Sequence, residues 1–244
     1  MCFRTTASPA EGWATREEAF DHETRDETPL AKAYRAVVDA ALDEAEADAK
    51  ENGAPPVAAL VMECVLHGAG GMDLIDPTFQ RATIQACRAR GLPVVLDEVF
   101  AGIWRLGAEG AWELLGEKPD VSCYAKLFTG GLTPLAATAT TEEVFDAFRG
   151  PTKQNALLHG HSYTAYPIGC AVAAEAQRMY RDPLINDNLV EMGGGDARAA
   201  SGPLRVGGGP LRVGGPGPPR LRRDFLTLVP IRPRSRGERR SLRT

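Results

Sequence analysis

The chain has 244 residues, 43% of them hydrophobic, and a net charge of −4, which allows one domain with its own core. No apolar run approaches the roughly 20 residues of a membrane span, and five cysteines without a CxxC pair indicate reduced thiols. The charge is uneven: residues 194–244 hold twelve arginines, no lysine and three acids, so the negative charge belongs to the rest of the chain.

The first predicted elements are a helix and three strands. Residues 1–28 are polar and acidic without periodicity, so we expect a poorly ordered segment there. Apolar residues at helical spacing begin at Leu30, and Asn52-Gly53 ends this pattern. Three continuous apolar runs follow, and such runs are typical of parallel strands buried on both faces; they span residues 58–65, 92–96 and 121–125.

A further helix lies between the first two of these strands. Asp76-Pro77 combines a good N-cap with a good first helical residue, and Gly91 closes the stretch after Arg90. This strand–helix–strand order predicts an α/β fold with a mostly parallel sheet. A strand is also expected at residues 134–140, and helices at 141–149 and 167–180.

The sequence changes character after Met192. The heptapeptide GPLRVGG occupies residues 202–208 and is repeated at 209–215, and Gly, Pro and Arg dominate to the end. A basic nucleic-acid-binding arm is one interpretation, and a shifted frame of GC-rich DNA would give the same composition. Because the segment has little apolar surface to bury, we predict a disordered low-complexity tail at 193–244 after a folded unit at 29–192.

An acidic residue ends the second predicted strand, where the sequence reads VVLDEV and Asp97 follows Leu96. An acid at the carboxyl end of a buried strand faces the crevice in which open α/β sheets bind ligands. A Walker B acid would need a GxxxxGK[ST] loop, and the sequence contains none. The remaining candidates are a partner for the ring nitrogen of pyridoxal phosphate and a structural strand-end cap.

A lysine ends the third predicted strand, in the sequence SCYAKLFTGG, where Lys126 precedes a glycine turn. An apolar setting would partly desolvate the amine and lower its pKa, which favours imine formation. Lys126 alone would be interpreted as a surface lysine. Together with Asp97 at the neighbouring strand end, it predicts a site that holds both poles of one pyridoxal phosphate.

Four segments carry a family resemblance: LVMECVLHGAGGM at 60–72, LDEVFAGIWRLG at 96–107, YAKLFTGG at 124–131 and LLHGHSY at 157–163. They resemble the class III, fold type I aminotransferases, and within them the diaminopelargonate aminotransferases of biotin synthesis, including the aminotransferase half of the bifunctional dethiobiotin synthetase–aminotransferases. The Asp-to-Lys separation of 29 residues also fits this resemblance.

The resemblance implies roles for five residues. Asp97 would pair with the pyridine nitrogen, Val99 would pack on the ring, and Lys126 would form the imine with the cofactor. Ser162 stands where the family has Thr in HGxT and would bind the phosphate across a dimer interface. Glu63 matches the Glu of the family's E-P-V segment near the cofactor, although Cys64 replaces the proline.

The same resemblance implies a reaction and an assembly. The fold would be part of the large domain of a homodimeric enzyme that transfers an amino group from S-adenosylmethionine to 8-amino-7-oxononanoate. The alternatives are another class III transaminase, acting on ornithine, acetylornithine or aminobutyrate, and an inactive fragment that acts only as a dimerising module. No metal, nucleic acid or membrane partner is expected.

Two family features are expected to be missing from this chain: the phosphate-binding Gly/Ser loop upstream of the first matching strand, and the C-terminal domain. The resemblance therefore implies an internal piece of a larger enzyme that alone binds pyridoxal phosphate poorly. It also implies a mitochondrial location, with the cytoplasm as the alternative. Arg4 and Arg16 faintly suggest a transit peptide, whereas Glu11 and Glu17 argue against one.

Overall fold

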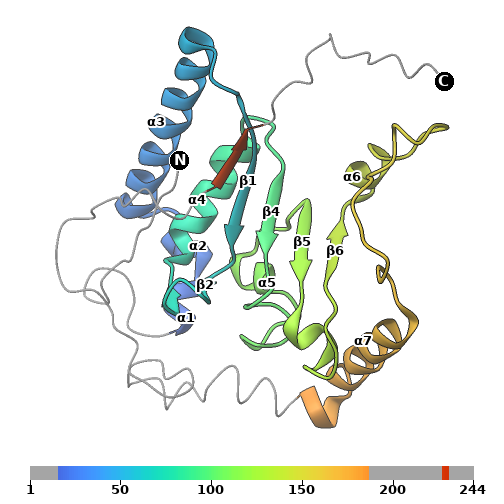
Figure 1. The fold of residues 1–244 in the computed structure, drawn as a ribbon. Helices are drawn as coiled ribbons and strands as arrows, with labels where there is room; N and C mark the ends of the chain where they lie inside the picture. Colours follow the sequence, from blue (N-terminus) through green and yellow to red (C-terminus); the bar gives the residue numbers. More distant parts are fainter. Residues whose placement is uncertain (1–15, 187–226, 231–244) are drawn as a thin grey trace, which may run out of the picture.

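The computed structural model describes residues 16–186 and 227–230, and Figure 1 shows their arrangement. One central sheet is flanked by helices, as the βαβ pattern predicted. In chain order the elements are α1 (Arg16–Phe20), α2 (His22–Arg25), α3 (Pro29–Asn52), β1 (Val57–Glu63), β2 (Leu66–His67), β3 (Asp73–Leu74), α4 (Pro77–Arg88), β4 (Val94–Asp97), α5 (Ala111–Leu115), β5 (Val121–Tyr124), the 3-10 helix η1 (Lys126–Thr129), β6 (Ala137–Thr140), α6 (Glu142–Asp146), α7 (Pro167–Tyr180) and β7 (Thr227–Pro230).

The central sheet has five strands in the order β6-β5-β4-β1-β7. The three inner strands β5, β4 and β1 run parallel to one another. Each outer strand is antiparallel to its neighbour: β6 pairs with β5, and β7 pairs with β1. The prediction of an α/β fold with a mostly parallel sheet is therefore confirmed. β2 and β3 form a separate two-stranded hairpin.

Helix α3 begins and ends at residues that the sequence indicates, and α4 begins at one, but α4 ends at Arg88 rather than at the predicted Arg90. The Thr28 hydroxyl accepts the N–H of Ala31 at 3.2 Å, and Gly53 ends α3 in a left-handed conformation with φ of 67°. Asp76 caps α4 by accepting the N–H of Thr78 at 2.9 Å, and Pro77 is the first helical residue. These caps fix the helices that precede β1 and β4.

The hydrophobic core lies on one face of the sheet, between β1, β4 and the helices α3 and α4. Leu60 and Leu96 point to this face and are fully buried, whereas Val61 and Val95 point to the other face and are only half-buried. The prediction of strands buried on both faces is therefore wrong for the described residues. The apolar runs are continuous because the side chains on both faces of these strands are apolar. In the described part of the chain, helices cover only the face that carries Leu60 and Leu96.

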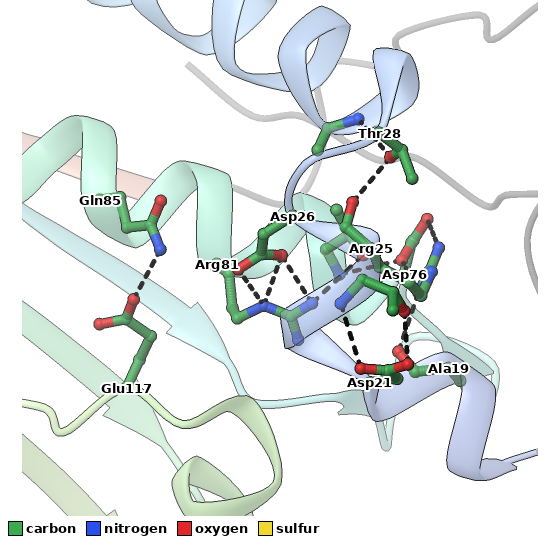
Figure 2. Close-up of polar contacts among 12 residues, drawn as sticks. Ala19, Asp21, Arg25, Asp26, Thr28, Asp76, Arg81, Gln85 and Glu117 are labelled. Carbon is green, nitrogen blue, oxygen red and sulfur yellow. Dashed lines mark hydrogen bonds and ion pairs between the residues drawn. The ribbon is translucent and has the colours of Figure 1, made fainter.

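Ion pairs attach the N-terminal segment to α4 (Figure 2). The Arg25 guanidinium contacts both carboxylate oxygens of the fully buried Asp76, at 2.9 and 3.0 Å, and donates to the carbonyl of Ala19 at 2.8 Å. Arg81 of α4 contacts Asp26 at 2.7 Å. The expectation of a poorly ordered segment at 1–28 is therefore wrong for residues 16–28, because these charge pairs order a stretch that lacks apolar periodicity.

The C-terminal part of the described chain differs from prediction in two places. The helix expected at 141–149 is shorter, since α6 ends at Asp146. Residues 227–230 form β7 beside β1, a strand that the composition of the segment at 193–244 did not indicate. The rest of that predicted tail lies outside the described residues. None of the described helices is long and apolar enough to cross a membrane.

Candidate active site

Three neighbouring strand ends form the centre of the candidate site. Glu63 of β1 is in register with Asp97 of β4, and Asp97 is in register with Cys123 of β5. Since neighbouring strands lie about 4.8 Å apart, Asp97 sits between the other two positions at the carboxyl edge of the parallel strands. This edge is where open α/β sheets bind their ligands.

Both carboxylates at this edge accept a backbone N–H from the loop that follows their own strand. Asp97 Oδ1 accepts the N–H of Val99 at 3.0 Å, and Glu63 Oε2 accepts the N–H of Gly68 at 2.8 Å. Asp97, Val99 and Glu63 are all half-buried. Each loop therefore holds a carboxylate in place and leaves its remaining oxygen lone pairs available.

Lys126 lies two residues after the end of β5 and is the first residue of η1. Its φ is 51°, a left-handed conformation that costs a non-glycine residue about 1–2 kcal/mol. Such strain persists at functional positions that the surrounding fold over-determines. The side chain is exposed, so the expectation that an apolar setting desolvates its amine is wrong for the described residues.

Phe100 connects Lys126 to the loop that follows Asp97. The Lys126 Nζ is 5.5 Å from the centre of the Phe100 ring, and the Arg105 guanidinium is 4.5 Å from the same centre. Gly68 admits this ring, because a Cβ at position 68 would lie 2.7 Å from Phe100 Cγ. The structure thus brings Lys126 and the segment after Asp97 to one place, as their positions at successive strand ends predicted.

Ser162 lies in a turn before α7, and its side chain is exposed. It forms no hydrogen bond with Asp97 or Lys126 in the described part of the chain. Two of its neighbours are fixed locally: Thr164 Oγ1 accepts the N–H of His161 at 2.9 Å, and His161 Nδ1 accepts the N–H of Tyr163 at 3.1 Å. Among the described residues there is no group of three metal-ligating side chains.

Glu98 is a buried acid for which the sequence predicted no role. Its carboxylate accepts the N–H of Ala111 at 2.5 Å, the hydroxyl of Ser122 at 3.2 Å and the hydroxyl of Tyr124 at 3.4 Å. Burial raises the pKa of the Glu98 carboxyl, and these three hydrogen bonds oppose that rise. Because side chains alternate along a strand, the sequence places Glu98 on the face opposite Asp97, but it does not show that this face is the covered one.

Comparison with known families decides the classification. The aminotransferase class-III family model matches residues 20–194. The chain belongs to the class-III aminotransferases. The resemblance stated from the four sequence segments is therefore confirmed.

Curated relatives refine the position of the chain within the class-III aminotransferases. The bifunctional dethiobiotin synthetase/7,8-diamino-pelargonic acid aminotransferase of Oryza sativa subsp. japonica is 52% identical over 68% of this chain and 20% of that protein. Its counterpart from Arabidopsis thaliana is 49% identical over 74% of this chain and 21% of that protein. The chain thus spans about a fifth of the length of these two relatives.

Solved structures show the same fold. A Bacillus anthracis aminotransferase superposes with a TM-score of 0.57 at 24% identity, over 74% of this chain and 38% of that one. The taurine:2-oxoglutarate aminotransferase of Bifidobacterium kashiwanohense, solved with pyridoxal phosphate (PLP) and glutamate, superposes with a TM-score of 0.54 at 28% identity. The superposition covers 66% of this chain and 35% of the taurine:2-oxoglutarate aminotransferase chain.

Proposed function

We propose that this chain carries the reactive lysine and the ring-nitrogen partner of a pyridoxal-phosphate-dependent transaminase of biotin synthesis. The observation that carries the proposal is the register of the parallel strands, which places Asp97 beside the strand that leads to Lys126. The proposed amino donor is S-adenosylmethionine, and the proposed acceptor is 8-amino-7-oxononanoate. A Synechococcus elongatus relative named for this reaction is 38% identical over 64% of this chain and 35% of its own length.

The residues at the strand ends fit the cofactor chemically. The Asp97 carboxylate is held by a single backbone N–H and can accept a second hydrogen bond from a protonated ring nitrogen. The Lys126 Nζ is exposed and makes no ion pair within the described residues, so its lone pair can react once the amine is deprotonated. One site therefore offers an acceptor for the ring and a nucleophile for the aldehyde.

Pyridoxal phosphate, when bound, supplies an aldehyde that takes up the donor's amino group and a ring that withdraws electrons. Asp97 would hold the proton on the ring nitrogen and so keep the ring electron-deficient. The Lys126 Nζ would hold the cofactor's aldehyde carbon, and as a free amine it would move the proton at the donor's α-carbon. Val99 would pack against the ring, and Glu63 lies beside Asp97 at the same edge.

A second copy of the chain would complete the phosphate site. Ser162 retains the hydroxyl that can donate to a phosphate oxygen, and its side chain is exposed in the turn before α7. Around it, Leu157, Leu158 and Tyr163 are 64%, 81% and 74% exposed, which is typical of an interaction surface rather than of a monomer's exterior. We therefore include a homodimer in the proposal, and a mitochondrial location on the printed names of the two plant relatives.

A donor-competition experiment tests the proposal. The purified chain is incubated with pyridoxal phosphate, with or without an amino donor, and is then reduced with borohydride so that labelled lysines can be mapped. S-adenosylmethionine should lower the labelling of Lys126 because its amine competes for the same aldehyde, whereas ornithine should lower it less. Equal or stronger competition by ornithine would favour another class-III transaminase, and Lys126 labelled no more than Lys118 would contradict a cofactor site.

A further inference from the structure

Glu98 occupies an unusual position for an acidic side chain. It follows Asp97 directly, at the end of β4, and its side chain is 0% exposed. Because side chains alternate along a strand, Asp97 points toward the candidate cofactor side and Glu98 points to the opposite side. A carboxylate this deeply buried persists only when its oxygens are hydrogen-bonded.

The hydrogen bonds of Glu98 join three elements, namely the end of β4, α5 and β5. Oε2 accepts the N–H of Ala111 at the start of α5, at 2.5 Å. Oε1 faces the hydroxyls of Ser122 and Tyr124 at 3.2 and 3.4 Å, and both residues belong to β5. Tyr124 stands two positions before Lys126, so the backbone that carries the reactive lysine is tied to the residue beside Asp97.

The backbone of Glu98 adds two further links. Its N–H donates to the carbonyl of Cys123 at 3.0 Å, and its carbonyl accepts the N–H of Gly102 at 2.9 Å. Gly102 approaches so closely that a Cβ there would lie 2.9 Å from the Glu98 carbonyl oxygen and 3.1 Å from Oε2. The loop that carries Phe100 is thereby folded around Glu98.

We propose that Glu98 is a positioning residue that holds the Asp97 strand end and the strand leading to Lys126 in the arrangement required for the cofactor. The inference rests on the proposed function, since it concerns the same site. It adds a residue that touches no substrate and acts through Ser122 and Tyr124. Removing a hydrogen-bond partner of a metal ligand lowers metal affinity or activity by about 10- to 100-fold, and we expect a loss of similar size when Glu98 is removed.

Asp120 provides a matched control for this role. Its Oδ2 accepts the N–H of Val94 at 2.7 Å, so it also joins β4 to the segment that leads into β5. This link lies at the amino end of β4, far along the strand from Asp97. A general loss of sheet stability would therefore follow from changing either acid, whereas a loss of site geometry would follow only from changing Glu98.

The test compares four variants of the whole chain with the unmodified protein: Glu98→Leu, Glu98→Gln, Asp120→Ala and the double variant S122A/Y124F. Leucine is close in size to glutamate but accepts no hydrogen bond. Glutamine can accept from Ala111 through its oxygen and donate to both hydroxyls through its amide, so it should preserve the links. Thermal unfolding followed by circular dichroism identifies a temperature at which all variants are folded, and the readouts are taken at that temperature.

Two readouts are used. Hydrogen–deuterium exchange needs no cofactor, and it should be faster in the peptide around Lys126 for Glu98→Leu and S122A/Y124F only. Borohydride-trapped pyridoxal phosphate gives the labelling of Lys126 relative to Lys118. This ratio should fall about tenfold in Glu98→Leu, fall in S122A/Y124F, and stay unchanged in Glu98→Gln and Asp120→Ala.

The outcomes separate the two proposals. If the unmodified chain labels Lys126 and Lys118 equally, the proposed function fails and the role of Glu98 fails with it. If the unmodified chain prefers Lys126 and Glu98→Leu keeps that preference, only the positioning role is overturned. Equal losses in Glu98→Leu and Asp120→Ala would also overturn it, because both would then reflect stability alone.

Discussion

Replacing Arg25 by methionine should destabilise the fold strongly, because it removes one partner of a buried ion pair. Arg25 is 8% exposed, and its partner Asp76 is fully buried. Without the guanidinium, the Asp76 carboxylate would keep two partners among the described residues, the Tyr34 hydroxyl at 3.1 Å and the N–H of Thr78 at 2.9 Å. Breaking a buried pair in this way costs about 3–5 kcal/mol. Domains are stable by only about 5–15 kcal/mol, so the loss should be large in any unfolding curve.

Urea unfolding followed by circular dichroism measures this effect, with Arg149→Met as the matched control. The Arg149–Asp146 pair has side chains 63% and 53% exposed, so its loss should cost at most about 1 kcal/mol. The double variant R25M/D76N should recover part of the loss, because no buried charge then lacks a partner while an amide oxygen still caps α4. An Arg25→Met variant as stable as Arg149→Met would refute the view that this ion pair docks the N-terminal helices.

Three further predictions concern the site. Asp97→Asn should leave the urea midpoint unchanged, since the amide oxygen can still accept the N–H of Val99, but should slow donor-dependent conversion of pyridoxal phosphate to pyridoxamine phosphate by about 100-fold; an unchanged rate would exclude Asp97 as the ring partner. Burial raises the pKa of Glu98 above its ordinary 4.5, so wild-type stability relative to Glu98→Gln should be greatest below that pH and decline as pH rises; thermal unfolding across a pH series that showed the opposite slope would contradict this. Gly68→Ala should cost about 1–3 kcal/mol, because the added methyl would meet Phe100, and calorimetry showing no loss would contradict that packing.

The fold could be predicted largely because its boundaries are marked by local signals. Asp76-Pro77 begins α4, and Asn52-Gly53 ends α3, since capping and left-handed turns depend on a few adjacent residues. The order of strand and helix then determined the α/β class. The helices α1 and α2 could not be predicted, because Arg25 and Asp76, which hold them, lie 51 residues apart in sequence.

The candidate site was predicted only in part. Asp97 and Lys126 could be found because strand-end position alone places them at one edge of a parallel sheet. The exposure of Lys126 and the role of Glu98 depend on which face of the sheet is covered, and an apolar run on both faces does not reveal this. The contact of Phe100 with Lys126 depends on the path of the loop after Asp97. Gly68 leaves room for the Phe100 ring, but a glycine in the sequence does not indicate which side chain will pack against it.

The distribution of pyridoxal phosphate among the five lysines of the chain tests the central claim most directly. After borohydride reduction and peptide mapping, Lys126 should carry more label than Lys32, Lys50, Lys118 or Lys153. Limiting cofactor should sharpen this preference, since Lys126 follows the strand that pairs with Asp97, and Asp97 can hold the ring. Label spread over the lysines in proportion to their exposure would contradict the assignment of Lys126 as the reactive residue.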